Sequence, residues 1–282
     1  AFADCTALTT VYIPDTIEKV DYETTFSGCE SLSLSKYENG LYLGNENNRY
    51  ILMLKYERPE SGSELMDFSV KDGTRIVLLD DWFSSYYRLK LPSSVVYIAG
   101  TRNWESPAAI FDGTATDWLL VNAEFVFSSL TFSDGRTAKE ITAIELDESF
   151  TSLPDMKQFS NLKSITIPAT LDSVSASLNI DTVYYHGTVE QWCNLKHFYI
   201  QAKHFYLLNE NNAYYEPTVI VIPDNIESIS EQFYGLESVK IIVLPKNLTG
   251  MLVNSSRGNS FNKNTCVIYF AGTYEEFIKS PE

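Results

Sequence analysis

The chain has 282 residues, of which 44% are hydrophobic and 13% aromatic, so it carries ample apolar surface for a stable core. It has 37 acidic against 21 basic residues, a formal net charge of −16, and no run of Lys and Arg. Nucleic acids and anionic membrane surfaces are bound through clustered cations, so both are disfavoured as partners. No segment approaches the roughly 20 consecutive apolar residues of a membrane-spanning helix, so direct membrane insertion by this segment is not expected.

The first element in the chain belongs to a pattern that occurs five times, apolar-x-apolar-Pro-x-x-apolar-x-x-apolar. Its copies lie at residues 11–20, 89–98, 165–174, 220–229 and 242–251. The alternation before each Pro predicts a short strand, which Pro ends because it has no N–H for the ladder. The period of three after Pro predicts a tight turn or a 3₁₀-like return. Pro223 and Pro245 are 22 residues apart, about one coil of a repeat solenoid.

Two cysteines occupy equivalent places in neighbouring F-x-x-C-x-x-L segments, Cys5 and Cys29. In the copies aligned on their prolines, the place of Cys5 is taken by Phe83, Phe159, Tyr214 and Leu236. This predicts an interior packing position, where a free Cys acts as a small hydrophobe. The alternative is a Cys5–Cys29 disulfide between adjacent coils, although four cysteines are too few for a disulfide scaffold.

Residues 37–56, YENGLYLGNENNRYILMLKY, depart from the repeat. Two apolar runs flank the turn-forming segment Gly-Asn-Glu-Asn-Asn, which predicts a β-hairpin inserted into the array. Insertions in repeat proteins often lie on one face, sometimes the binding face. We slightly favour the alternative that the hairpin is a lateral ornament.

A second repeat occurs at residues 109–118, 183–192 and 267–277. In each copy an apolar strand is followed by Gly-Thr, then by an acidic or amide residue, and then by an aromatic residue. Thr114, Thr188 and Thr273 are suited to cap short helices, and Gln or Glu three residues later completes a capping box. We expect the aromatic residue that follows, Trp118 or Trp192, to pack in the core rather than to serve as a ligand platform.

The domain organisation predicted from these repeats is a single solenoid over residues 1–282. Its sub-blocks span about 1–125, 126–205 and 206–282, and the hairpin is inserted at about 37–56. The chain opens in the second half of a repeat, so we expect an array truncated at its N-terminus that forms part of a longer chain.

The residues offer little support for catalysis, a metal site or a cofactor. His197 and His204 are seven residues apart, but no neighbouring Cys or carboxylate completes a metal-ligand set. The sequence contains no G-x-S-x-G, G-x-G-x-x-G or Walker A motif. The acidic pairs Asp80/Asp81 and Glu275/Glu276 are adjacent, so their side chains point apart. We therefore predict no catalytic residue, no metal and no cofactor.

The remaining candidates are a set of outward positions. If the residues one and three before each Pro are buried, the residue between them faces out of the sheet. The same alternation before the Gly-Thr turns buries Phe111, Tyr185 and Phe270. The outward residues that we name as candidate ligand contacts are Tyr12, Lys90, Thr166, Tyr184, His186, Val221, Val243 and Tyr269. A surface that mixes Tyr, His and exposed Val resembles a protein-recognition face. The alternative is that these are ordinary exposed sheet residues.

The motif F-x-x-C-x-x-L-x-x-V-x-I-P-x-x-I-x-x-V, from Phe2 to Val20, resembles the repeat of the BspA-like leucine-rich-repeat family of bacterial surface proteins. The GT-x-x-x-W segments and the ENGLYLGNENNRY hairpin are also similar to elements of that family. The resemblance implies a curved right-handed superhelix with a parallel β-sheet on the concave side and short helices or 3₁₀ turns on the convex side. It also implies a secreted or cell-surface location and a role in adhesion or in recognition of host or matrix proteins.

These expectations combine into a non-enzymatic recognition module that binds a protein or glycan along the sheet face. Two alternatives stay open: a structural spacer in a larger surface protein, and an enzyme that acts on polysaccharide. The enzyme would require at least two carboxylates that converge on one sheet face and have perturbed pKa values.

Overall fold

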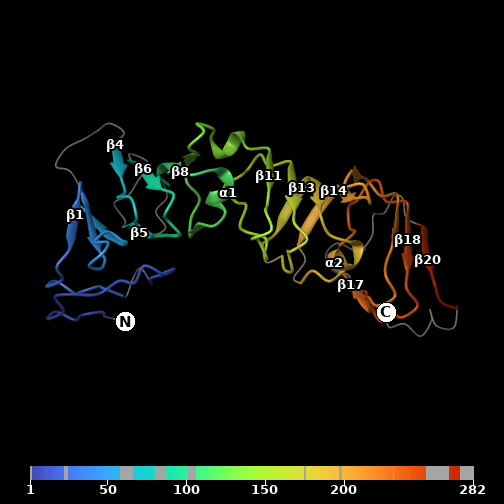
Figure 1. Cartoon of the computed structure of the whole chain (residues 1–282), viewed down its shortest axis with the longest axis horizontal. Helices are drawn as coiled ribbons and strands as arrows, with labels where there is room; N and C mark the ends of the chain where they lie inside the picture. Colours follow the sequence, from blue (N-terminus) through green and yellow to red (C-terminus); the bar gives the residue numbers. More distant parts are fainter. Residues whose placement is uncertain are drawn as a thin grey trace. The chain divides into compact units, whose positions relative to one another are not determined.

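A computed structural model describes residues 2–21, 25–57, 66–79, 87–100, 106–174, 176–196, 199–230, 232–251 and 267–273. The chain divides into two compact units, Ala1–Ile141 and Thr142–Glu282, which we call unit 1 and unit 2 and describe separately. In both units short strands stack as successive rungs (Figure 1).

In the described part of unit 1 the strands form two sheets, and the chain alternates between them. One sheet has the order β1-β2-β3-β5-β7-β9 and the other has the order β10-β8-β6-β4. The strands of the first sheet are β1 (Ser35–Tyr37), β2 (Gly40–Leu43), β3 (Leu52–Tyr56), β5 (Ile76–Leu79), β7 (Tyr97–Gly100) and β9 (Asn122–Ala123). Those of the second are β4 (Met66–Ser69), β6 (Tyr87–Pro92), β8 (Ala108–Asp112) and β10 (Ser129–Thr131). Among the described residues, every pair of strands from β3 onward is parallel, as a solenoid requires.

The core of unit 1 extends over both faces of β5. Ile76 and Leu78 pack with Ile13, Val20 and other apolar residues of the first coils. Val77 and Leu79 point to the opposite face of the strand and are also buried. Strands buried on both faces read as continuous apolar runs, which explains the sequence IVLL at this place.

The predicted hairpin at 37–56 is present, and β2 pairs antiparallel with β3. It is not a lateral ornament, and that expectation was wrong. Strand β3 also pairs parallel with β5 and so forms a rung of the solenoid. Leu52 and Met53 have no exposed surface, because successive side chains point to opposite faces and both faces are covered. On the other side, β1 adds a third antiparallel strand.

The described residues of unit 2 form three sheets. The largest has the order β11-β12-β13-β14-β15, the second β16-β18-β20 and the third β17-β19. Their strands are β11 (Ala143–Glu145), β12 (Ser164–Ile167), β13 (Leu178–Tyr185), β14 (Ile200–Leu208), β15 (Tyr214–Tyr215), β16 (Val219–Val221), β17 (Ser228–Ile229), β18 (Ile241–Leu244), β19 (Gly250–Met251) and β20 (Val267–Phe270). All pairs are parallel except β14 with β15, which form a hairpin.

The turn predicted after each Pro is confirmed in all five copies. The N–H three residues beyond Pro donates to the Pro carbonyl, at 3.1 to 3.3 Å. These N–H groups belong to Ile17, Val95, Leu171, Ile226 and Leu248. Beyond the turn the chain continues as a second short strand, such as β7, β17 or β19, a feature that the period of three did not predict. The described part of the chain contains little helix: α1 (Ala115–Trp118), α2 (Val189–Cys193) and the 3₁₀ segment Ala138–Glu140.

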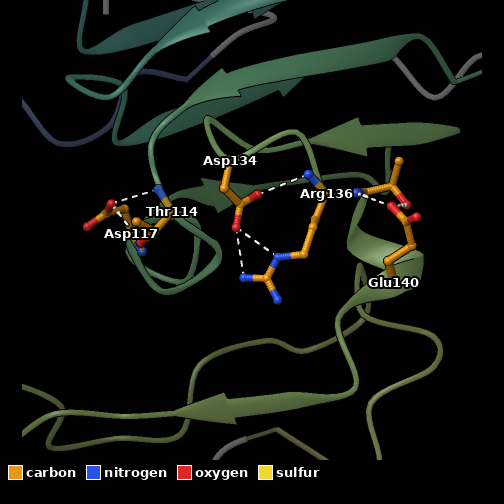
Figure 2. A network of polar contacts seen from close by, with 6 residues as sticks. Thr114, Asp117, Asp134, Arg136 and Glu140 are labelled. Carbon is orange, nitrogen blue, oxygen red and sulfur yellow. Dashed lines mark hydrogen bonds and ion pairs between the residues drawn. The ribbon is translucent and has the colours of Figure 1, made fainter.

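The Gly-Thr turns at Thr114 and Thr188 each begin a capped helix, as predicted. Thr114 Oγ1 accepts from the Asp117 N–H at 3.1 Å, and the Asp117 carboxylate accepts from the Thr114 N–H at 2.8 Å (Figure 2). Thr188 and Gln191 form the same capping box at α2. The aromatic residue that follows is buried each time, so the core assignment of Trp118 and Trp192 is confirmed. Residues 274–277 of the third copy lie outside the described residues.

The glycine of these turns is required by close packing. A Cβ at Gly113 would lie 2.4 Å from the Phe111 ring, and one at Gly187 would lie 2.4 Å from the Tyr185 ring. The aromatic side chain two residues earlier therefore folds against a backbone that only glycine permits. Phe111 and Tyr185 are buried as predicted, whereas Phe270 is only partly buried.

The interior position predicted for Cys5 is wrong, because Cys5 is exposed while Cys29 is buried. Phe2 and Asp4 donate backbone hydrogen bonds to Thr25 and Ser27, so residues 2–5 pack against the next coil on one side. Among the described residues no coil covers the other side. Cys5 and Cys29 are both free thiols, and Cys29 Sγ contacts the Phe2 carbonyl at 2.9 Å.

Candidate functional site

The predicted strand forms before Pro92, Pro168, Pro223 and Pro245, whereas residues 11–13 before Pro14 form no strand. Residues one and three before Pro are buried in the copies at Pro92, Pro168, Pro223 and Pro245, and the residue between them is exposed or half-buried. In the first copy Ile13 is buried, Val11 is half-buried and Tyr12 is 66% exposed. The eight candidate residues therefore do face outward, but they fall on four separate surfaces.

Thr166, Tyr184 and His186 meet on the outer face of the sheet β11 to β15. Strand register pairs Thr166 with Tyr184 and then Tyr184 with Tyr206. The rings of Tyr184 and Tyr206 stack with centroids 5.0 Å apart, and the Tyr214 ring lies 4.9 Å from Tyr184 at a steep angle. We call Thr166, Tyr184, His186, Tyr206 and Tyr214 the tyrosine face.

The hairpin of β14 and β15 folds Tyr214 back over this face. Its hydroxyl lies 2.6 Å from His186 Nε2, and it also hydrogen-bonds with Thr166. Burial is the main cause that raises the pKa of Tyr214, and the nearby Glu145 carboxylate adds to it. One side chain thus spans three strands and holds the face in one arrangement.

A carboxylate fixes the edge of the tyrosine face. Glu216 Oε1 lies 2.9 Å from His204 Nδ1, and Glu216 also accepts from the Tyr206 hydroxyl. Burial is the main cause that raises the pKa of Tyr206, followed by the charge of Glu216. His204 is therefore tied to a carboxylate, a contact that the sequence did not indicate.

Val221, Val243 and Tyr269 form a row across β16, β18 and β20, since the register pairs each with the next. Val221 is 59% and Tyr269 is 56% exposed. The neighbouring row, Val219, Ile241 and Val267, is also apolar. Apart from Tyr269, both rows present aliphatic side chains, unlike the tyrosine face.

Lys90 lies in unit 1, on the outer face of the sheet β4 to β10. It shares a register row with Ser69, Ile110 and Thr131. Its ammonium is 2.9 Å from Asp67 Oδ2, and Arg88 binds the same carboxylate at 2.7 Å. The hydrogen bond from Lys90 is the main cause that lowers the pKa of Asp67, and Arg88 contributes as well.

A groove of about 530 Å³ opens beside Lys90. The floor of the groove is formed by the carboxyl ends of the strands on the outer face of this sheet. Tyr37 and Lys71 form one wall, and the turn at residues 132–135 forms the other. We call this the unit 1 groove. Tyr12 does not take part in it, because the Ile13 N–H next to Tyr12 bonds to the Gly44 carbonyl, at the other sheet.

Sequence reasoning missed Tyr206, Tyr214, His204, Glu216 and the groove. Tyr206 lies 22 residues after Tyr184, one coil length, so the repeat spacing could have found it. The alignment on prolines predicted an interior position for Tyr214, and this was wrong: Tyr214 is 42% exposed, and its contacts arise only when the hairpin folds back.

The described residues contain no group of three or more His, Cys, Asp or Glu that could hold a metal ion. His197 and the pairs Asp80/Asp81 and Glu275/Glu276 lie outside the described residues. Where a pKa shift is clear at a described carboxyl, the pKa is lowered by ion pairs or hydrogen-bond donors. These groups are Asp67, Asp134, Glu140, Asp147 and Asp181. A glycosidase acid needs a raised pKa, so these five give no support to the enzyme alternative.

Within the described ranges, no helix has the length and apolar character to cross a membrane.

Comparison with known proteins identifies repeats of one family. The BspA type Leucine rich repeat region matches the chain in 6 copies, over residues 1–47 and 210–262. Among solved structures, a leucine rich cell surface protein from Faecalibacterium prausnitzii A2-165 is similar, with 12% sequence identity and a TM-score of 0.34. That similarity covers 78% of this chain and 72% of the other. No curated protein matches the chain.

Proposed function

Because this chain is a leucine-rich-repeat solenoid of the BspA type, we propose that it is a non-enzymatic recognition module of a bacterial cell-surface or secreted protein. Its ligand, a protein or a glycan on a host or matrix surface, binds across the tyrosine face of unit 2. The observation that carries the proposal is the contact set of Tyr184, Tyr206 and Tyr214 with His186.

The chemistry of this face supports recognition of a macromolecule. Tyrosine offers a large apolar ring and a hydroxyl at low cost in side-chain entropy, which explains its enrichment at binding sites. Here the rings are ordered before a ligand arrives, because Tyr214 is held by His186 and Thr166. Side chains that are already ordered lose less freedom on binding.

The position of the face also supports the proposal. It lies on strands whose opposite sides form the core, with Ile165, Val183 and Phe205 all buried. A rigid sheet presents side chains in a fixed register, about 4.8 Å apart from strand to strand. A flat array of this kind suits an extended surface of a partner more than a small molecule.

The proposal is tested with the double variant Tyr184→Ala/Tyr214→Ala. Purified chain is measured by biolayer interferometry against immobilised collagen, fibrinogen, fibronectin, laminin and mucin. Central tyrosines of interfaces typically contribute at least about 2 kcal/mol, so affinity for whichever of these binds the native chain should fall by more than about tenfold. The matched control is Tyr199→Ala, since Tyr199 is 55% exposed in the same unit and lies outside the tyrosine face.

Equal binding by the folded double variant, or an equal loss in Tyr199→Ala, would remove the tyrosine face as the binding surface. The spacer alternative has its own test. Cells that display the chain on an unrelated anchor are compared with cells that display an unrelated spacer of equal length. Equal adhesion to these five surfaces would favour spacing over recognition.

A further inference from the structure

The unit 1 groove differs from the tyrosine face in shape and in chemistry. It is a concave site of about 530 Å³, within the range of roughly 300 to 1,000 Å³ typical of small-ligand sites. It lies in the other unit of the chain, so a ligand of this groove is independent of the function proposed for the tyrosine face.

One wall of the groove is ordered by the hairpin of unit 1. The Lys71 N–H donates to the Tyr42 hydroxyl at 3.3 Å, and the Lys71 ammonium lies 4.7 Å from the centre of the Tyr37 ring. The Ser69 N–H donates to Glu38 at 3.3 Å, which ties the β1–β2 turn to β4. The hairpin that departs from the repeat therefore supplies and positions this wall.

The opposite wall is a turn fixed by backbone hydrogen bonds, one within the turn and one to the preceding coil. The Gly135 N–H bonds to the Phe132 carbonyl at 2.9 Å, and the Ser133 N–H bonds to the Gly113 carbonyl at 3.0 Å. Gly135 has a φ of 84°, a conformation that favours glycine. Arg136 and Asp134 are paired with each other beside this turn, at 2.7 Å (Figure 2). Contacts within the protein therefore hold both walls in place when no ligand is bound.

The lining of the groove contains both hydrogen-bond donors and acceptors. Lys71 and Lys90 supply ammonium donors, and Asp72 and Asp112 supply carboxylate acceptors. The lining also includes the hydroxyls of Ser69, Thr131 and Ser133 and the apolar side chains of Ile110 and Pro92. The carboxylate of Asp112 makes no ion pair or hydrogen bond with any residue that the structure describes. Two positive and two negative groups leave the lining without a net charge.

This lining selects for a particular chemistry. A purely anionic ligand would meet Asp72 and Asp112, and a purely cationic one would meet Lys71 and Lys90. A saccharide hydroxyl both donates and accepts, so neighbouring hydroxyls can bond to a carboxylate and an ammonium together. The C–H face of a sugar ring can lie on Ile110, which is half-buried, and this contact removes apolar surface from water. We propose that the unit 1 groove binds a short, uncharged oligosaccharide.

The test uses the full chain and four neutral trisaccharides: cellotriose, laminaritriose, mannotriose and galactotriose. Binding is measured by saturation-transfer-difference NMR and by isothermal titration calorimetry. The native chain should bind at least one of them. Asp112→Ala and Lys71→Met should each weaken that binding by about tenfold or more, since each removes charge-assisted hydrogen bonds. In Lys71→Met the apolar stem beside Tyr37 is kept.

Two controls separate the groove from other causes. Glu46→Ala removes an exposed carboxylate of unit 1 that lies outside the groove lining and should leave sugar binding unchanged. Tyr184→Ala, in unit 2, should also leave it unchanged, whereas Asp112→Ala should not affect binding at the tyrosine face. Failure of one proposal is therefore visible independently of the other.

The proposal is overturned if none of the neutral trisaccharides binds, or if binding survives both groove variants. It is also overturned if only trigalacturonic acid binds, because an anionic ligand would then be preferred. Binding of an extended peptide library in place of all sugars would identify the groove as a peptide site and reject the saccharide. Unchanged melting temperatures of the variants show that any loss arises in the groove.

Discussion

Replacing Trp192 by Phe should destabilise unit 2 more than the equivalent change destabilises unit 1. Trp192 is only 2% exposed and packs on Tyr185 and Phe205 with ring centroids 4.9 and 4.6 Å apart. Its indole N–H donates to the Gln232 carbonyl at 2.9 Å, across to the next coil. The Gln232 amide returns to the Cys193 carbonyl at 3.2 Å. These two bonds join successive coils.

The size of the effect follows from two losses. Removing about three ring atoms from a filled core costs on the order of 2 kcal/mol, at roughly 0.8 kcal/mol for each buried CH₂-sized group. Leaving the Gln232 carbonyl buried without its donor adds about 1–3 kcal/mol. Trp118→Phe is the matched control, since Trp118 is 5% exposed and packs on Phe111 and Phe127. Its indole N–H makes no hydrogen bond with the described residues, so that variant should lose only the packing contribution.

The measurement is hydrogen exchange by mass spectrometry over a urea series, because it reports the opening free energy of each unit separately. In Trp192→Phe the opening free energy of peptides around α2 should fall. The fall should be about 1–3 kcal/mol larger than the fall for peptides around α1 in Trp118→Phe. Equal losses in the two variants would show that the bond between coils contributes nothing beyond packing, and the reasoning would be refuted.

Two further predictions concern buried polar groups. The Tyr185 hydroxyl is buried without a hydrogen-bond partner among the described residues. Tyr185→Phe should therefore raise the free energy of unfolding by about 1 kcal/mol or more, which a urea titration would show as a higher midpoint. A lower midpoint would contradict this. Burial raises the pKa of the Cys193 thiol to about 12, from 9.0. Above about pH 9 the unfolded chain releases this proton while the folded chain keeps it, so stability should fall as pH rises from 9 to 12. At pH 8 iodoacetamide should modify the exposed Cys5 much faster than Cys193, as peptide mapping would measure; equal rates would reject the burial of Cys193.

Features set by neighbours in the sequence could be predicted. The turn after each Pro depends on residues within three positions, and all five turns form as expected. The capping boxes at Thr114 and Thr188 depend on a residue three positions later. Alternating burial before Pro92, Pro168, Pro223 and Pro245 follows from the pleat of a strand.

Features that depend on which segment packs over a given surface could not be predicted from the sequence. Cys5 and Cys29 share one local motif, yet only Cys29 is buried, because burial depends on what packs from outside the motif. The hairpin at 37–56 was correctly predicted as a hairpin, but its place as a rung depends on β3 pairing with β5. Neither sequence motif contains information about the segment that packs against it in the folded chain.

The candidate sites divide in the same way. The sequence alone determined that Thr166, Tyr184 and Lys90 point away from the core, since a period of two leaves no other side for them. Only the tertiary structure decided that Tyr214 folds over Tyr184 and His186, and that the hairpin places Tyr37 beside Lys71. Side-chain direction is set by the backbone of one strand, whereas a binding surface requires contacts between segments that the sequence keeps far apart.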